Sequence, residues 1–131
     1  MKKYLVIGNP IDHSLSPKLH NFWFKKHNIS ANYEKKKTTL EDLEILLEKI
    51  RNKEINGINV TVPFKKEIIV HLDSLSLESE KTQSVNTIYL NNDKIIGHNT
   101  DIGGFENSIK SINYDLFQKT VFIIGSGGVV P

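Results

Sequence analysis

The sequence predicts an α/β protein, a three-layer α/β/α domain with a mostly parallel sheet. Short strands alternate with amphipathic helices through most of the chain, an order typical of a parallel sheet covered on both faces. The chain has 131 residues, enough for one domain with a real core. Hydrophobic residues make up 38% and charged residues 24%, as in an ordinary globular protein.

The composition excludes several classes of function. The net charge is only +2 with signs interspersed, which gives no support for nucleic-acid binding. There is no cysteine, and the five histidines show no metal-ligand spacing, so we predict no metal site. No apolar run approaches the roughly 20 residues of a membrane span, and the first residues lack a signal-peptide pattern. We therefore predict a cytoplasmic location.

The first elements are two strands with a helix between them. Residues 4–7 form a short apolar strand, and residues 31–37 form a second with Tyr33 facing inward. The helix begins at Ser16, a preferred N-cap residue type that is followed by proline. Its apolar positions recur at helical spacing, so we expect Trp23 in the core.

The clearest helix is predicted over residues 39–53. Two capping boxes fit its start, Thr38 with Glu41 or Thr39 with Asp42. Its apolar residues recur at three and four positions and predict a buried face; they are Leu40, Leu43, Leu46, Leu47 and Ile50.

The next stretch of chain reads as a strand followed by helices. Residues 57–62 alternate apolar and polar types and are rich in β-branched residues, which predicts a strand. Pro63 ends that strand and favours a helix over residues 63–72, with Lys65 in its first turn. A second short helix is expected over residues 73–83.

The last part of the chain begins with a predicted hairpin. Its strands cover residues 86–90 and 94–96, joined by a tight turn at 91–93. A helix follows from about residue 101 to 109. Residues 120–124 then form an apolar strand that runs directly into a glycine-rich loop, the way in which dinucleotide-binding units begin.

Lys65 stands out because of where it lies. A cation in the first turn of a helix is misplaced, since the positive end of the dipole favours anions. The lysine also follows the polar pair Asn59 and Thr61 at the carboxyl end of a strand, where open α/β sheets place ligands. A solvent-facing lysine is the alternative interpretation. We interpret Lys65 as a functional residue.

Five segments of the chain resemble the shikimate dehydrogenases, in order and at the expected spacings. They are Gly8–Asn21 (GNPIDHSLSPKLHN), Asn59–Lys65 (NVTVPFK), Val85–Thr87 (VNT), Gly97–Asp101 (GHNTD) and Gly125–Gly128 (GSGG). One such motif is weak evidence, whereas five in register make chance an unsatisfactory explanation.

The resemblance implies reversible, NADP-dependent reduction of 3-dehydroshikimate to shikimate, a step of aromatic amino-acid biosynthesis. It implies an acid/base pair made by Lys65 and Asp101. The residues that it implies for substrate binding are Ser14, Ser16, Asn59, Thr61, Lys65, Asn86, Thr100 and Asp101. Those that it implies for the NADP pyrophosphate are Gly125, Ser126, Gly127, Gly128 and Val129.

Each of these residue types also has a plain structural interpretation. Ser16 can be a helix cap and Ser14 a turn residue, although a helix N-terminus with two hydroxyls also suits a carboxylate. Asp101 can be an N-cap. The short polar side chains can satisfy loop backbone groups, although a polyhydroxylated ring needs several such partners.

The resemblance leaves alternatives open. A quinate/shikimate dehydrogenase is the nearest one, although the retention of Ser14 and Ser16 favours shikimate. A truncated binding module without redox activity is another. Ile102 stands where the family has glycine, and Leu77 where it has an acidic residue. The residue that distinguishes NAD from NADP would follow a strand beyond this chain. Whether the protein forms a homodimer is open.

We predict that residues 1–100 form the substrate-binding domain. Residues 101–131 would then be a linker helix and the beginning of an incomplete Rossmann-type domain, because such a unit needs at least about 30 residues after its glycine loop. On this interpretation the chain is the N-terminal part of a longer enzyme, and the 131 residues alone are inactive.

Overall fold

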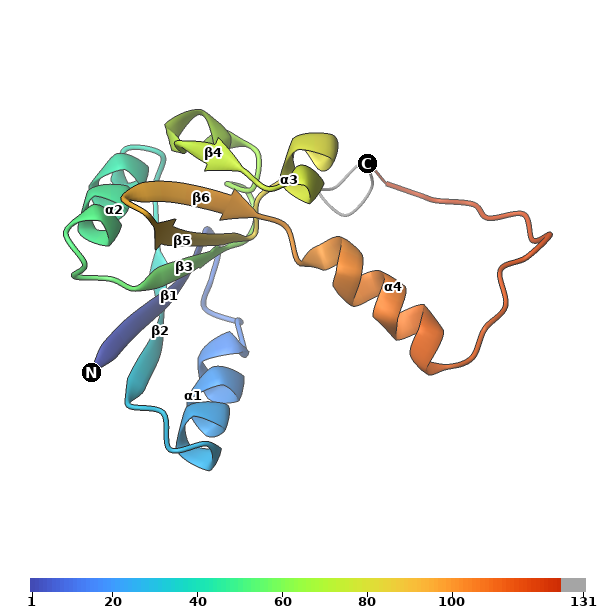
Figure 1. Cartoon of the computed structure of the whole chain (residues 1–131), viewed down its shortest axis with the longest axis horizontal. Helices are drawn as coiled ribbons and strands as arrows, with labels where there is room; N and C mark the ends of the chain where they lie inside the picture. The colour runs from blue at the N-terminus through green and yellow to red at the C-terminus, as the bar shows by residue number, and fades with distance from the viewer. Residues whose placement is uncertain (126–131) are drawn as a thin grey trace.

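The computed structural model describes residues 1–125 and contains one six-stranded sheet in the order β2-β1-β3-β5-β6-β4 (Figure 1). The strands are β1 (Lys2–Gly8), β2 (Ala31–Lys37), β3 (Gly57–Val60), β4 (Ser74–Leu75), β5 (Thr87–Asn91) and β6 (Lys94–His98). The helices are α1 (Ser16–Lys26), α2 (Asp42–Arg51), α3 (Leu77–Thr82), α4 (Asp101–Ser111) and the 3₁₀ helix η1 (Glu67–His71). Three of the five strand pairings are parallel, which confirms the predicted mostly parallel sheet.

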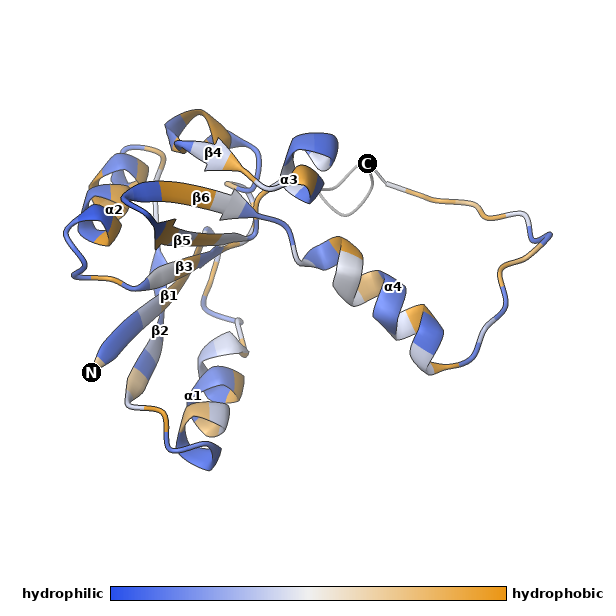
Figure 2. Cartoon of the chain, viewed as in Figure 1, coloured by the Kyte–Doolittle hydropathy of each residue, from blue (hydrophilic) through white to orange (hydrophobic). Residues whose placement is uncertain are grey.

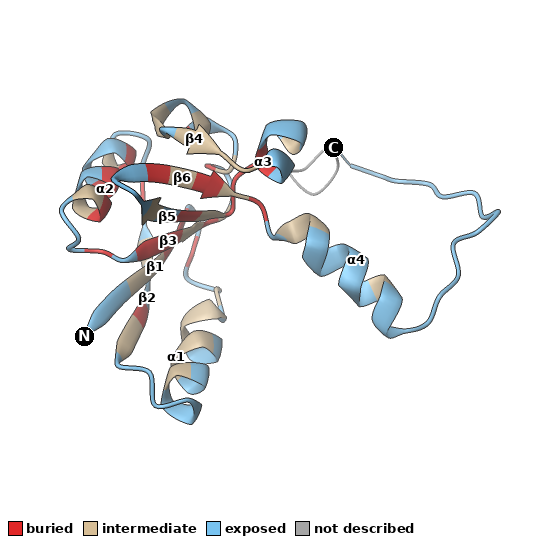
Figure 3. Ribbon diagram, viewed as in Figure 1, coloured by how far each residue is buried: buried red, intermediate tan, exposed pale blue. Residues whose placement is uncertain are grey.

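The two faces of the sheet carry separate cores, as the predicted three layers require. Neighbouring strand residues point to opposite faces, so Ile7 and Val6 belong to different clusters. The larger cluster includes the buried face of α2, and the smaller one contains Tyr33 and lies on the side of α1. The buried segments in Figure 3 are concentrated on the central strands and α2, which agrees with this arrangement.

Helix α1 differs from the prediction in two ways. Its N-cap residue is Leu15, so the expectation that Ser16 caps the helix is wrong. Trp23 is 45% exposed and is not a core residue. The reason is that α1 packs on β2 at the edge of the sheet, through His20 and Phe24, which lie against the rings of Tyr33 and Tyr4. The apolar stripe that contains Trp23 is left outside.

Helix α2 begins at Asp42, three residues later than predicted. The Asp42 carboxylate accepts hydrogen bonds from the Thr39 amide at 2.9 Å and from its hydroxyl at 3.1 Å. Only the carboxylate half of the Thr39–Asp42 box forms. The N-cap residue is Glu41 and makes no side-chain cap hydrogen bond, so neither threonine caps the helix and both alternatives are wrong. The predicted buried face is confirmed except for one residue that precedes the helix and is exposed, Leu40.

The predicted helix over residues 63–72 is wrong. Residues 62–66 form a turn, and only η1 is helical. The Lys65 carbonyl accepts a hydrogen bond from the Val85 amide at 2.8 Å, so it is diverted from a helical ladder. Lys65 therefore precedes η1 instead of lying in its first turn, and the argument from a helix dipole does not apply.

Two later elements also differ. The helix expected over 73–83 is limited to α3, because residues 74–75 pair with β6 as β4. Residues 120–124 form no strand in the described chain; they run extended beyond α4 and are exposed (Figure 1). A strand needs a hydrogen-bonded neighbour, and the sheet of the domain ends at β2 and β4.

The hairpin is confirmed. Strands β5 and β6 pair antiparallel, and Asn92 and Asp93 have φ values of 48° and 58°, as a tight hairpin turn requires. Helix α4 confirms the helix predicted after residue 100. Among the described residues, no helix has the length and apolar character needed to cross a membrane.

Candidate active site

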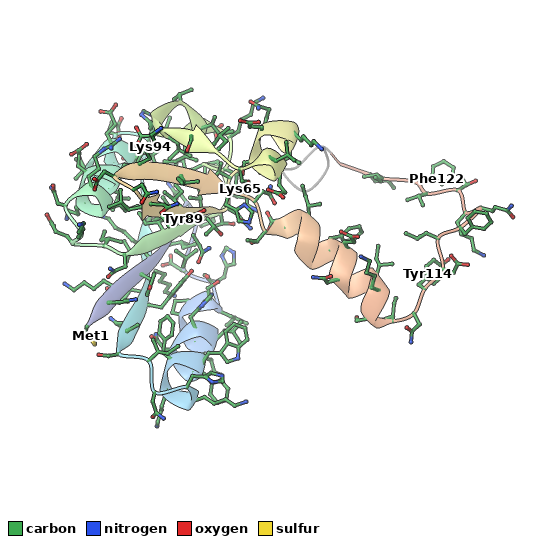
Figure 4. All side chains as sticks on the ribbon, in the orientation of Figure 1. Met1, Lys65, Tyr89, Lys94, Tyr114 and Phe122 are labelled. Carbon is green, nitrogen blue, oxygen red and sulfur yellow. The ribbon has the colours of Figure 1, made fainter. Side chains whose placement is uncertain are left out.

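The topology brings most of the predicted site residues to one edge of the sheet. Strand β3 ends just before Thr61, and the chain turns there through Lys65. Strand β5 runs antiparallel to β3, so Asn86, which precedes β5, meets the end of β3. Strand β6 ends at His98, and Asp101 follows at the start of α4. Figure 4 shows Lys65 beside the junction of β6 and α4.

Lys65 and Asp101 form an ion pair. The distance from Lys65 Nζ to Asp101 Oδ2 is 2.5 Å, and their side chains are 22% and 25% exposed. The pair is thus sheltered but still reachable by a small molecule. Asp101 is the first residue of α4, where a carboxylate is favourably placed against the helix dipole.

Asn99 holds the start of α4. Its Oδ1 accepts hydrogen bonds from the amides of Asp101 at 2.8 Å and Ile102 at 3.4 Å, and its Nδ2 donates to the Ser84 carbonyl at 3.0 Å. The interpretation of Asp101 as an N-cap is therefore wrong, because Thr100 is the N-cap residue and Asn99 satisfies the first amides. The sequence analysis did not assign Asn99 to the site. Its signal was the position two residues before Asp101 in the same motif.

Asn86 connects the segments of the site. It is 9% exposed, and its Nδ2 donates to Asp101 Oδ1 at 2.7 Å and to Thr100 Oγ1 at 2.8 Å. Its Oδ1 accepts a hydrogen bond from the Thr100 amide at 3.0 Å. A carboxylate can only accept and a backbone N–H can only donate, so the Asn86 side chain has one possible orientation. The structure thus brings Lys65, Asn86, Thr100 and Asp101 into one network.

Asn59 lies behind this network. Its Nδ2 donates to the Asn86 carbonyl at 3.1 Å and to Thr87 Oγ1 at 3.0 Å, and its Oδ1 accepts from the Tyr33 hydroxyl at 2.7 Å. Both ends of the amide are occupied by protein groups, so Asn59 braces the site. Thr61 lies at the same edge, with its amide bonded to the Ile7 carbonyl at 2.9 Å.

Ser14 and Ser16 lie in and after the loop that follows β1. The Ser16 amide donates to Ser14 Oγ at 3.4 Å, so Ser14 reaches the open start of α1. Within the described residues, neither serine shares a hydrogen bond with the Lys65 network. The structure therefore leaves these two predicted site residues as a separate group.

Only the first residue of the predicted cofactor loop is described. Gly125 is exposed and has a φ of 130°, a conformation that favours glycine. Ser126, Gly127, Gly128 and Val129 lie outside the described residues.

The arrangement can move a proton. An amine and a carboxylate in contact, one of them braced by a fixed amide, can share a proton with a hydroxyl placed beside them. A secondary alcohol needs this when it is oxidised, because its oxygen must lose a proton.

Several known proteins share the sequence pattern and the fold of this chain. The family model described as the shikimate dehydrogenase substrate binding domain matches residues 6–88. A shikimate dehydrogenase (NADP(+)) from Pelagibacter ubique is 55% identical over 129 residues, which are 98% of this chain and 49% of that relative.

Two solved structures share the fold over nearly the whole chain. Shikimate dehydrogenase 1 from Peptoclostridium difficile gives a TM-score of 0.90 at 36% identity. Shikimate 5-dehydrogenase from Thermus thermophilus in complex with shikimate gives 0.90 at 33%. In both cases 98% of this chain and 49% of the other are covered, so the chain spans about half the length of these relatives. Because the family model matches more than half of its residues, the chain belongs to the shikimate dehydrogenase family through its substrate-binding domain.

Proposed function

We propose that this chain is the substrate-binding domain of an NADP-dependent shikimate dehydrogenase, which reversibly reduces 3-dehydroshikimate to shikimate. The observation that carries the proposal is the sheltered Lys65–Asp101 pair, braced by Asn86 at the carboxyl edge of the sheet. The names of the similar proteins support the substrate and the cofactor. Residues 1–100 would form the domain, and residues 101–131 would be a linker helix and the beginning of a Rossmann-type domain.

The mechanism uses the pair as a proton relay. In the direction of oxidation, the Lys65 amine accepts the proton of the substrate hydroxyl, and Asp101 stabilises the ammonium that forms. In the reverse direction the ammonium gives its proton to the ketone oxygen. NADP, which Gly125, Ser126, Gly127, Gly128 and Val129 would hold, would supply the hydride chemistry. Asn86 fixes Asp101, so the carboxylate does not need to reorient during the reaction.

The remaining polar residues would bind the substrate. Ser14 and Ser16, at the start of α1, would hold its carboxylate with their hydroxyls. Thr61 and Thr100 would contact ring hydroxyls, together with the exposed parts of Lys65 and Asp101. Asn59 would act as a brace, because its amide is already occupied.

The setting of the enzyme is part of the proposal. We propose a cytoplasmic enzyme of the shikimate pathway that acts on a small molecule and has no nucleic-acid or membrane partner. A homodimer is the oligomeric state to test, by sedimentation of the complete enzyme.

The test is the replacement of Lys65 in the complete enzyme. We expect Lys65→Met to lower kcat by about 10²- to 10⁴-fold, the usual contribution of general acid–base catalysis. KM for shikimate should change much less, because the other site residues still hold the ring. Lys66→Met is the matched control, since Lys66 is the exposed neighbour in the same turn.

Three results would change the proposal. Equal, small effects at Lys65 and Lys66 would contradict the acid/base role. A wild-type enzyme with a higher kcat/KM for quinate than for shikimate would identify a quinate/shikimate dehydrogenase. Shikimate binding by calorimetry with no reduction of NADP by the complete protein would indicate a binding module.

A further inference from the structure

A chain of hydrogen bonds runs from Tyr33, on the α1 side of the sheet, to the Lys65–Asp101 pair. It starts at the Tyr33 hydroxyl, which donates to Asn59 Oδ1 at 2.7 Å. Asn59 Nδ2 donates to Thr87 Oγ1 at 3.0 Å, and the Thr87 hydroxyl donates to Asn86 Oδ1 at 3.0 Å. Asn86 Nδ2 then donates to Asp101 Oδ1 at 2.7 Å.

Every donor in this chain points the same way, from Tyr33 towards Asp101. A hydroxyl has a single proton, and a side-chain amide has one donor end and one acceptor end. Thr87 accepts from Asn59, so its single proton is left for Asn86. Asn59 presents its donor end to Thr87 while Tyr33 supplies a proton to its other end. The Asn86 carbonyl, which can only accept, fixes which way the Asn59 amide faces, and the Tyr33 hydroxyl supplies the donor that Asn59 Oδ1 needs in that orientation.

Tyr33 is built to hold that hydroxyl in place. The residue is 3% exposed, and its ring stacks on His20 with centroids 4.3 Å apart and planes inclined by 5°. Its backbone is clamped by the Asn21 amide, which accepts from the Tyr33 N–H at 2.9 Å and donates to its carbonyl at 2.8 Å. Burial raises the pKa of Tyr33 well above its ordinary value, so the hydroxyl keeps its proton.

A small pocket lies beside this chain of hydrogen bonds. A cavity of about 320 Å³ lies on this face of the sheet, lined by the rings of Tyr4, His20, Tyr33 and Tyr89 and by Asn59. Without the Tyr33 proton, the acceptor end of Asn59 would face this mostly apolar space with no donor. Turning the amide over would set its oxygen against the Asn86 carbonyl, so Asn59 would instead gain by moving, and that movement reaches Thr87 and Asn86.

We propose that Tyr33 is a positioning residue for the acid/base pair, acting through Asn59, Thr87 and Asn86 on the Asp101 carboxylate. Its effect on catalysis rests on the proposed function, whereas its effect on the two asparagine side chains does not. Tyr33 touches none of the reacting atoms. It would affect the reaction at Lys65 only through this chain of hydrogen bonds.

The experiment uses Tyr33→Phe in the complete enzyme, with Tyr89→Phe as the matched control. Both changes remove a hydroxyl from the same face, and the ring of Tyr33 remains to stack on His20. We expect Tyr33→Phe to lower kcat about 10-fold with less than a two-fold change in KM for shikimate, and Tyr89→Phe to leave both at the wild-type value. In ¹⁵N-asparagine-labelled protein, the side-chain amide protons of Asn59 and Asn86 should exchange with solvent at least about five-fold faster in Tyr33→Phe only.

A double variant separates positioning from general loosening of the fold. Once Asn86→Ala has cut the chain, Tyr33→Phe should lower kcat no further. Effects of Tyr33→Phe and Asn86→Ala that multiply would overturn the proposal, and so would exchange rates for Asn86 that match those of Tyr89→Phe. If the wild-type enzyme does not oxidise shikimate, the proposed function fails, and the exchange rates alone then decide whether the chain of hydrogen bonds stands.

Discussion

At the scale of single residues, Asn86 decides the geometry of the candidate site. The sequence could indicate its importance through the Val85–Asn86–Thr87 motif, but it could not show what the side chain contacts. Those partners, Thr100 and Asp101, lie 14 and 15 residues away and are brought near by the pairing of β5 with β6. The motif could therefore point to Asn86 as a site residue, whereas the hydrogen-bond partners of its side chain depend on strand register.

Gly8 offers a test of how tightly the edge of the sheet is packed. A Cβ there would lie 2.6 Å from Thr61 Cγ2 and 2.9 Å from the Val62 carbonyl oxygen. Backbone cannot move aside cheaply, so Gly8→Ala should destabilise the fold by about 1–3 kcal/mol in urea unfolding, the usual cost of overpacking. It should also raise KM for shikimate in the complete enzyme, because Thr61 is displaced.

Gly103 supplies the control for this substitution. A Cβ there meets nothing within 4 Å, and the residue lies inside α4. Gly103→Ala should therefore leave stability unchanged or increase it by up to about 1 kcal/mol, since alanine favours helix. If the two variants unfold at the same urea concentration, the packing argument for Gly8 is wrong.

At the scale of elements, the regular strands and the buried face of α2 were predictable, because periodicity reports which side chains a sheet or helix buries. The elements that were predicted wrongly are set by tertiary contacts, which local sequence patterns do not show. The segment after Pro63 became a turn and η1 because a long-range hydrogen bond to Val85 takes the Lys65 carbonyl. Trp23 was misplaced because amphipathic spacing cannot show that α1 covers only the edge of the sheet.

Asp73 connects two of these elements and gives a prediction about pH. Its carboxylate accepts from Arg51 Nη2 of α2 at 2.9 Å and from the Ile95 amide of β6 at 2.7 Å. The Arg51 hydrogen bond and then the Ile95 amide lower the pKa of Asp73 below its ordinary value of 3.8. A lowered pKa stabilises the fold above about pH 3.8, and this contribution is lost as the pH falls through the folded-state pKa.

The variant Asp73→Asn removes this titration. Wild type should have the higher urea midpoint at pH 7, and the difference between the two proteins should shrink below about pH 3.8. Glu80→Gln, at an exposed site on α3, is the control and should not show this pattern. A difference between wild type and Asp73→Asn that stays constant from pH 7 to pH 3 would show that the charge of Asp73 has no part in stability.

At the scale of the whole molecule, the chain divides into a packed domain and an extended end. None of the described residues after Asn99 is buried; α4 leads away from the sheet, and the segment after it makes a wide loop that turns back (Figures 1 and 3). Figure 2 shows that this end is nevertheless partly hydrophobic. The sequence predicted a strand there from its apolar residues. Such a strand depends on neighbours that the domain does not supply, so composition alone could not decide its structure.

The extended end should control association but not stability. The side chains of Val121, Phe122 and Ile124 are 61%, 88% and 100% exposed, and an apolar, uncharged segment of this kind can pair with a second copy through its backbone. A shortened chain of residues 1–111 should therefore unfold within about 0.5 kcal/mol of the 131-residue chain, because none of the described residues 112–125 is buried. In light scattering at equal concentration, the 131-residue chain should form larger particles and the shortened chain should remain monomeric. Val121→Lys in the longer chain should reduce the particle size, whereas Val70→Lys, the same change at the 82% exposed Val70 of η1, should not. A shortened chain that unfolds at clearly lower urea would mean that the end packs on the domain, and equal effects of the two lysines would mean that net charge, not this segment, governs association.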